Sequence, residues 1–225
     1  GAMGVEIQSL VQMLENRETV TLSGIEYAKG TIHNREVVLA VCGIGKVFAA
    51  VCAQTMILKF APDVIINTGV AGTLTESLTI GDIAVSENVA QHDMDTTALG
   101  DPAGFLSGIN IIKIPADGKT RQLLVDCIKQ LGVNYRTGTI CSGDQFLASQ
   151  EVKDRIVKNF GAIAGEMEGG AIGQVCFINN VKFCVLRAIS DRADGSGAEN
   201  YFEFLEQAAQ TAVNVIDRFI KMSGE

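Results

Sequence analysis

The chain has 225 residues, of which 47% are hydrophobic and 20% are charged. This length and composition suit one soluble globular domain and exclude a chain that is largely disordered. The net charge of −8 gives a surface that repels polyphosphate, so we expect no nucleic-acid partner. We see no secretion signal and no apolar run long enough to cross a bilayer, so we expect a cytoplasmic protein without a membrane partner.

The first third of the chain contains helical and extended patterns in turn. Apolar spacing predicts a helix over Val5–Leu14, and two extended stretches, Thr19–Gly30 and Thr31–Val41, then indicate a hairpin or a meander. Lys46–Phe60 is rich in helix formers and stops shortly before a proline. Asp63–Gly69 follows as a β-branched run without alternation, which is typical of a strand that is buried on both faces.

The rest of the chain alternates between strands and helices. The predicted strands are Ile80–Val89, Ile109–Ile114, Thr137–Cys141, Ala162–Ala164 and Val181–Ser190. The predicted helices are Lys119–Leu131, Ser149–Phe160, Glu166–Phe177 and Glu199–Met222. This alternation predicts one α/β domain over residues 1–225 with a mostly parallel sheet, and in such sheets ligands bind at the carboxyl ends of the strands.

Three predicted strand ends carry small residues or an aromatic ring. Cys42–Lys46 and Asn67–Gly72 are rich in glycine, which lets backbone approach a ligand closely. The first segment lacks the spacer of a phosphate loop, so we interpret it as a strand-to-helix turn. The third segment, Ser142–Phe146, ends in a ring that is able to stack on a planar ligand or to pack in the core.

A fourth strand end combines a buried cation with an acid. Arg187 lies inside an apolar strand that ends in Ser190 and Asp191. Burying an arginine is costly unless a carboxylate or a ligand pairs with it. Asp191 is suited to proton transfer to a ligand. Alternatively, Asp191 caps the following turn while Arg187 bridges to a neighbouring acid, and the spacing does not separate these interpretations.

Three glutamates are further candidates. Glu166 and Glu168 open a predicted helix, whose N-terminus would stabilise their charged form. Charged Glu168 would be able to accept hydrogen bonds from sugar hydroxyls, or both residues are simply solvated in the first helical turn. Glu6 is locally typical of the polar face of the first helix.

Together with Gly1–Met3, these segments resemble one family, the 5′-methylthioadenosine/S-adenosylhomocysteine nucleosidases, in order and spacing over essentially the whole chain. The resemblance implies a three-layer, nucleoside phosphorylase-like α/β sandwich, with a mixed, mostly parallel sheet flanked by helices. It implies a homodimer whose partner chain closes the 5′ pocket, and no metal or cofactor. The implied reaction is hydrolysis of the N-glycosidic bond of 5′-methylthioadenosine, S-adenosylhomocysteine and 5′-deoxyadenosine, which releases adenine and serves methionine salvage.

The resemblance also implies a role for each site residue. Asp191 matches the general acid that protonates adenine N7, assisted by Ser190. Glu6 matches the base that activates the attacking water, and Arg187 helps to hold that water. Glu168 matches the ligand of the ribose hydroxyls. The implied substrate-binding positions are Met3, Ile44, Ala71, Gly72, Phe146, Leu147, Glu166, Met167 and Tyr201.

Three other functions remain open. They are a phosphate-dependent purine nucleoside phosphorylase, a 6-amino-6-deoxyfutalosine nucleosidase and a non-catalytic nucleoside-binding module. Phosphorylases of this superfamily typically place an arginine where this chain has Asn67, which favours hydrolysis. A binding module needs no acid and base together, which argues against the third alternative.

Three features depart from the family pattern. Val70 stands where some relatives have a serine, so one possible contact with water or ribose is lost. Leu99 stands where an aromatic residue commonly closes the partner's 5′ pocket. Family members also begin with a short strand ahead of the segment that matches Gly1–Met3. We therefore expect either residues upstream of Gly1 or another way of filling that place in the sheet.

Overall fold

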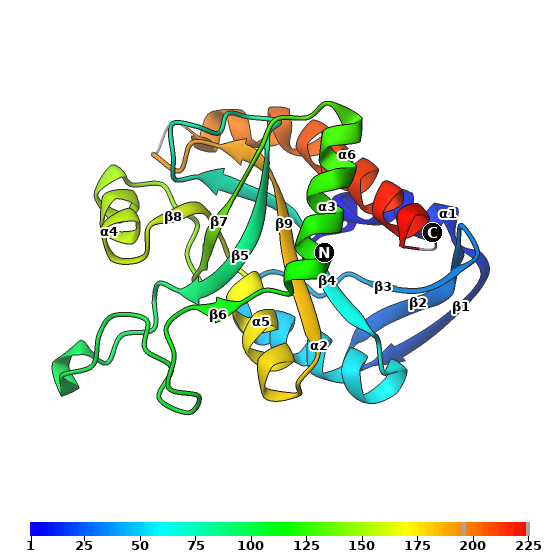
Figure 1. The fold of residues 1–225 in the computed structure, drawn as a ribbon, viewed down its shortest axis with the longest axis horizontal. Coiled ribbons are helices and arrows are strands. Elements are labelled where there is room, and N and C mark those ends of the chain that lie inside the picture. Colours follow the sequence, from blue (N-terminus) through cyan, green and yellow to red (C-terminus); the bar gives the residue numbers. More distant parts are fainter. Residues whose placement is uncertain (195–196, 224–225) are drawn as a thin grey trace.

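The computed structural model describes residues 1–194 and 197–223, without the side chains of 197–203 (Figure 1). Its helices are α1 (Gln8–Met13), α2 (Lys46–Phe60), α3 (Gly118–Leu131), α4 (Gln150–Phe160), α5 (Gly169–Ile178) and α6 (Gly197–Met222), with 3₁₀ turns η1 (Gly4–Glu6) and η2 (Thr97–Leu99). Its strands are β1 (Glu15–Leu22), β2 (Ile25–Ile32), β3 (Arg35–Ala40), β4 (Val64–Thr73), β5 (Ile83–Gln91), β6 (Ile114–Pro115), β7 (Tyr135–Ser142), β8 (Ala162–Glu166) and β9 (Lys182–Asp191).

The larger sheet has the strand order β6-β5-β7-β8-β4-β9, and β5 also pairs with β9, so the sheet closes on itself. The pairs β4–β9, β5–β7 and β7–β8 are parallel, whereas β4–β8, β5–β6 and β5–β9 are antiparallel. This mixed sheet with helices around it confirms the predicted α/β fold (Figure 1).

The alternation of side chains along β9 shows how the helices cover the larger sheet. Phe183 and Val185 pack in the cluster that holds α2 and α5. Cys184 and Leu186 pack in the cluster that holds α3 and α6. Successive strand residues point to opposite faces, so β9 is apolar on both sides, as its continuous apolar run predicts. Arg187 interrupts that run.

The smaller sheet contains β1, β2 and β3 in antiparallel order. The predicted single strand over Thr19–Gly30 is wrong, because a tight turn divides it. Ser23 and Gly24 both have positive φ, as do His33 and Asn34 in the next turn. Two consecutive residues with positive φ make the turn that best joins twisted antiparallel strands.

Three other predicted bounds need correction. Ile109–Ile114 is mostly a loop, since only Ile114 and Pro115 pair with β5. The helix expected over Val5–Leu14 is divided into η1 and α1. The helix expected from Glu166 begins at Gly169, because Glu166 still pairs with β7.

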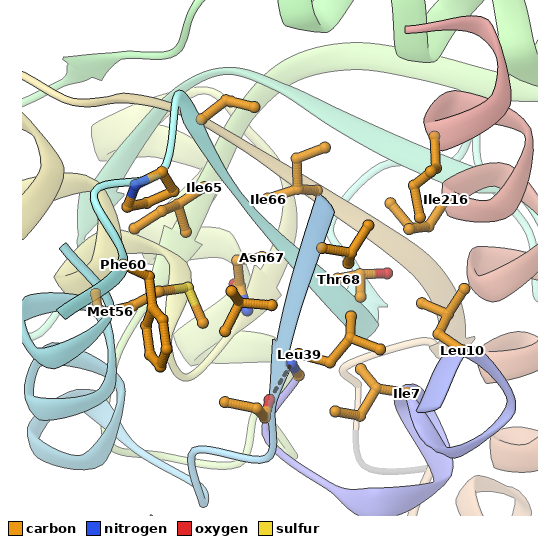
Figure 2. A pocket seen from close by; sticks show the side chains of 18 of the residues that line it. Ile7, Leu10, Leu39, Met56, Phe60, Ile65, Ile66, Asn67, Thr68 and Ile216 are labelled. Carbon is orange, nitrogen blue, oxygen red and sulfur yellow. Dashed lines mark hydrogen bonds between the residues drawn. The ribbon is translucent and has the colours of Figure 1, made fainter. Parts of the chain in front are cut away.

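A cavity of about 830 Å³ separates β3 from the first half of β4. Figure 2 shows Leu39 of β3, Ile66 of β4 and Ile216 of α6 around it. Within the described residues, β3 pairs only with β2, and β4 pairs only with β9 over residues 64–71. Each of the two strands therefore presents one unpaired backbone edge to the cavity.

The chain start lies at one end of this cavity. The Gly1 amino group donates to Ala40 O at 3.2 Å, Cys42 N donates to Gly1 O at 2.9 Å, and Gly43 N donates to Ala2 O at 3.1 Å. These bonds have the spacing of a short parallel ladder. The expectation that a further strand belongs in this place stays a prediction.

Candidate active site

Arg187 is buried in β9, with 1% of its side chain exposed, and three carboxylates surround its guanidinium. Nη2 donates to Glu166 Oε2 and lies 3.3 Å from Glu168 Oε2, and Nη1 lies 4.0 Å from Glu6 Oε1. Nη2 also donates to Asn67 Oδ1 at 2.5 Å. One guanidinium facing three carboxylates leaves an excess of negative charge. Such a site is suited to stabilising positive charge on a ligand.

The electrostatics of this cluster shift two pKa values. Burial raises the pKa of Glu168, the charges of Glu166 and Glu6 add to the rise, and together they outweigh Arg187 and the Gly45 N–H, which lower it. Burial alone would lower the pKa of Arg187, but the three carboxylates raise it above its usual value. Arg187 therefore stays charged, and the Glu168 carboxylate is costly to keep ionised.

Glu6 ends η1 with its carboxylate turned inward and only 1% exposed. Oε2 accepts from Ala2 N at 2.6 Å and from Met3 N at 2.9 Å, and Oε1 accepts from Val70 N at 3.2 Å. A Cβ at Gly69 would clash with Glu6 Oε1, so the glycine makes room for the carboxylate. The local interpretation of Glu6 as a solvated helix residue is therefore wrong.

Glu166 is the last residue of β8, two residues before Glu168 in the chain. Protein donors bind both of its carboxylate oxygens. Ser142 Oγ donates to Oε1, and the backbone N–H groups of Glu168 and Gly169 donate to Oε2 at 3.0 and 2.7 Å. The carboxylate thus caps the start of α5 while it pairs with Arg187. The alternative of two solvated glutamates is wrong, since Glu166 and Glu168 are both buried.

Asp191 ends β9 and is 3% exposed. Its Oδ1 accepts from Ala193 N at 2.9 Å, and its Oδ2 accepts from Ser190 Oγ at 2.9 Å. Ser190 Oγ also lies 3.4 Å from Ala71 O, so its single hydrogen is able to go to either acceptor. A Cβ at Gly72 would lie 2.7 Å from Asp191 Oδ1. Asp191 therefore caps a turn, as one interpretation predicts, and it also keeps a hydroxyl partner for proton transfer.

The remaining predicted positions differ in exposure. Leu147 is buried. Met167, which lies between Glu166 and Glu168 in the sequence, is half-buried. Phe146 and Ile44 are exposed, at 49% and 53%, on the loops that follow β7 and β3. Tyr201 lies in α6, but its side chain is outside the described residues.

Two donors in this site were not predicted from the sequence. Ser142 Oγ holds Glu166, and Gly45 N donates to Glu168 Oε1 at 2.9 Å. Both lie in segments that the sequence analysis singles out at strand ends, but only the fold brings them to the glutamates. The contact of Asn67 with Arg187 was not predicted either.

The cysteines have no nucleophilic role in this site. All six are buried and none forms a disulfide. Burial raises the pKa of Cys42 to about 11 and of Cys176 to about 12, so these thiols stay protonated at neutral pH.

Comparisons with known proteins place this arrangement in a family. The model described as "Phosphorylase superfamily" matches residues 1–221. The chain is 40% identical over 222 residues to the 5′-methylthioadenosine/S-adenosylhomocysteine nucleosidase of Staphylococcus saprophyticus, covering 98% of this chain and 97% of that protein. The chain belongs to this nucleosidase family of the phosphorylase superfamily. As a member, the nucleosidase is an N-glycosyl hydrolase.

Solved structures agree with this membership. The nucleosidase superimposes on the Neisseria meningitidis 5′-methylthioadenosine/S-adenosylhomocysteine nucleosidase in complex with methylthio-immucillin-A with a TM-score of 0.95, at 35% identity over 99% of this chain and 96% of that one. A futalosine hydrolase of Helicobacter pylori gives a TM-score of 0.94, at 35% identity over 99% and 95%. Among the helices of the described residues, none is both long and apolar enough to cross a bilayer.

Proposed function

We propose that this chain hydrolyses the N-glycosidic bond of 5′-methylthioadenosine and S-adenosylhomocysteine, and of 5′-deoxyadenosine as well. The products are adenine and the 5-substituted ribose, so the reaction serves methionine salvage. The observation that carries the proposal is the position of Asp191 at the end of β9, the strand that also carries Arg187. Three carboxylates from other segments, Glu6, Glu166 and Glu168, face Arg187. An acid that can protonate adenine and a negatively charged cluster that can face the sugar thereby lie along one strand.

Asp191 acts in the proposed mechanism as the general acid. In its protonated form it delivers a proton to adenine N7, and adenine leaves as a neutral base when the C1′–N9 bond breaks. The Ser190 hydroxyl accommodates both the ionised and the protonated form of Asp191. It donates to the ionised carboxylate, whereas beside the protonated acid it donates to the Ala71 carbonyl and accepts from Asp191. Gly72 leaves room for the Asp191 carboxyl group.

Glu6 acts as the general base toward water. Three backbone amides hold its carboxylate, and Arg187 Nη1 lies 4.0 Å away. Glu6 takes one proton from the water as the oxygen attacks C1′, so the sugar gains a hydroxyl group and Glu6 gains the proton. Acid and base thus work on opposite sides of the bond that is cleaved.

Glu168 acts on the sugar through its negative charge. Its carboxylate accepts hydrogen bonds from the ribose hydroxyls and stabilises the positive charge that develops at C1′. Glu166 has its oxygens bound by protein donors, so it contributes by holding Arg187 and Glu168 in place. Met3, Ile44, Leu147 and Met167 line the nucleoside pocket, and Phe146 stacks on adenine.

The charge balance supports hydrolysis over phosphorolysis. Bound phosphate needs cationic or backbone donors. Among the described residues around this cluster, Arg187 is the one cation, and Glu166 and Asn67 already engage its Nη2 atom. The excess negative charge of the site would repel phosphate, whereas water is neutral and is not repelled. The reaction needs no cofactor or metal.

We further propose a homodimer that works in the cytoplasm. Large apolar side chains are exposed on α2, α5 and η2, and exposed apolar surface of this kind is typical of an interface. Exposed fractions are 73% for Val47, 57% for Phe48, 61% for Ile178 and 83% for Leu99. In the dimer, Leu99 of one chain closes the 5′ pocket of the other.

A second candidate is a 6-amino-6-deoxyfutalosine nucleosidase, because the futalosine hydrolase of Helicobacter pylori has the same fold at 35% identity. One substrate panel separates the two. The protein is incubated with 5′-methylthioadenosine, S-adenosylhomocysteine, 6-amino-6-deoxyfutalosine and inosine, and free base is followed by chromatography. The proposal predicts rapid release from the first two. Release from the futalosine derivative alone would replace it with the second candidate.

A further inference from the structure

Three loops are tied together by charged groups beside the candidate active site. Lys46 Nζ lies 2.7 Å from Asp93 Oδ1, and Asp144 N donates to Asp93 Oδ2 at 2.9 Å. Lys46 N in turn donates to Asp144 Oδ1 at 2.8 Å. The three residues follow β3, β5 and β7 respectively, so the contacts close a ring across three strand ends. We call this ring the clasp.

Within the clasp, the pair Lys46–Asp93 is more buried than an ordinary surface ion pair, whereas Asp144 is exposed. The side chains of Lys46 and Asp93 are 20% and 18% exposed, whereas those of the pair Lys29–Glu36 are 45% and 79% exposed. Burial acts to raise the pKa of Asp93, but the Lys46 ammonium and the Asp144 N–H outweigh it and hold that pKa below its usual value. Partly buried ion pairs are screened less than exposed ones, so the clasp holds its loops more firmly.

Gly45 links the clasp to the active site. It directly precedes Lys46, and its N–H donates to Glu168 Oε1 at 2.9 Å. Gly45 has a φ of 100°, and a Cβ there would lie 3.0 Å from Asp144 Oδ1. The turn is thus packed against the clasp on one side while it directs its N–H to Glu168 on the other.

Two lining positions lie on the same loops. Ile44 is next to Gly45, and Phe146 lies two residues after Asp144. Both side chains are about half exposed. The contacts between Lys46, Asp93 and Asp144 connect the segments that carry these two positions.

We propose that Lys46, Asp93 and Asp144 are positioning residues of the nucleosidase, which hold the Gly45 N–H on Glu168 and keep Ile44 and Phe146 against the nucleoside. This inference rests on the proposed function. In the described part of the chain, the three side chains have no contact with Glu6, Glu168 or Arg187, so they act through Gly45 and the loops. Because the loops are fixed before the nucleoside binds, binding does not have to order them.

The kinetic test uses the substitutions Asp93→Asn and Asp144→Ala, with Lys46→Arg as the conservative variant and Lys29→Met as the matched control. We expect the first two to raise KM for 5′-methylthioadenosine about tenfold, the effect of one hydrogen bond to a charged group, and to lower kcat less. K46R keeps a cation beside Asp93 and should retain most of the activity. K29M breaks an exposed pair and should leave KM unchanged. Unchanged KM in D93N and D144A would overturn the inference.

A second measurement does not depend on catalysis. Hydrogen exchange at the Gly45 amide, followed by NMR in protein without ligand, reports whether that N–H stays bonded to Glu168. We expect exchange about tenfold faster in D93N and D144A than in K29M and the unmodified chain. Equal exchange would overturn the inference even if activity fell. If the unmodified chain hydrolyses no adenine nucleoside, the proposed function is wrong, and the exchange data still decide whether the clasp holds Gly45.

Discussion

Arg187 and Glu166 form an ion pair in which the two side chains are 1% and 2% exposed. Glu166 comes from the end of β8 and Arg187 from the middle of β9, so the pair joins two strands that lie on either side of β4. Two further carboxylates of the candidate site are arranged around it. Glu6 and Glu168 face the same guanidinium, and Ser142 and the start of α5 hold the carboxylate.

Removing the cation should therefore destabilise the fold. Arg187→Met leaves three buried carboxylates without a cationic partner, and breaking a buried pair in this way costs about 3–5 kcal/mol. Urea unfolding measures the loss. Arg17→Met breaks an exposed pair with Glu26 and should cost no more than about 1 kcal/mol. Equal losses in the two variants would contradict the account of the cluster.

Asp191→Asn should abolish most turnover without preventing binding. The amide cannot deliver a proton to adenine, and a positioned general acid contributes about 10²–10⁴-fold to rate. The asparagine side chain has the same shape as the aspartate, so binding of 5′-methylthioadenosine should still raise the melting temperature of the variant. Ser190→Ala should lower kcat much less, because Asp191 keeps its contact with Ala193. Turnover within a few-fold of the unmodified chain would remove Asp191 as the acid.

Glu168→Gln should make the protein more stable at neutral pH and less active. Burial raises the pKa of Glu168 in the folded state, so the folded chain binds this proton more tightly than the unfolded chain does. The free energy of unfolding therefore falls as pH rises from the usual glutamate value through the raised one. Above the raised pKa the whole cost of ionisation is present, and E168Q removes it.

The same variant also tests the sign of this linkage. Unfolding measured from pH 7 down to pH 4 should show the advantage of E168Q shrinking as Glu168 takes up its proton. An advantage that grew toward pH 4 would contradict the raised pKa. Loss of activity with gain of stability is the common pattern for a residue that serves function at a cost to the fold.

The cavity between β3 and β4 gives a prediction about stability. An extension of about six apolar, β-branched residues ahead of Gly1 is long enough to pair with both free edges. We expect it to raise the free energy of unfolding by about 2 kcal/mol, the value of one well-buried aliphatic side chain after the cost of ordering. A glycine-serine extension of equal length is the control, and equal stability of the two would contradict the prediction.

Local sequence predicted those parts of the site that short-range patterns determine. The apolar run of β9 ending in Ser190 and Asp191 identified the strand and its polar end, where the proposed acid lies, because a strand buried on both faces has few polar residues. The helix over Lys46–Phe60 was predicted to the residue, since it ends just before a proline.

Contacts between distant segments determine the rest, and the sequence could not supply them. Glu6 is buried because Val70 and Arg187 lie against it, and no local pattern near Glu6 records this. Asp93 follows β5 without any motif, and only the pairing of β5 with β7 brings it to Asp144. The turn at Ser23 and Gly24 was missed, although a positive-φ pair is the reason that the extended stretch divides there.

The most direct test of the central claim is the sugar product formed from 5′-methylthioadenosine in buffer without phosphate. Mass spectrometry distinguishes 5-methylthioribose from its 1-phosphate, and adenine is quantified in the same sample. The account predicts full conversion to adenine and 5-methylthioribose without phosphate, with no 1-phosphate when phosphate is added, and almost no conversion by D191N. Strict dependence on phosphate, or formation of the 1-phosphate, would contradict it.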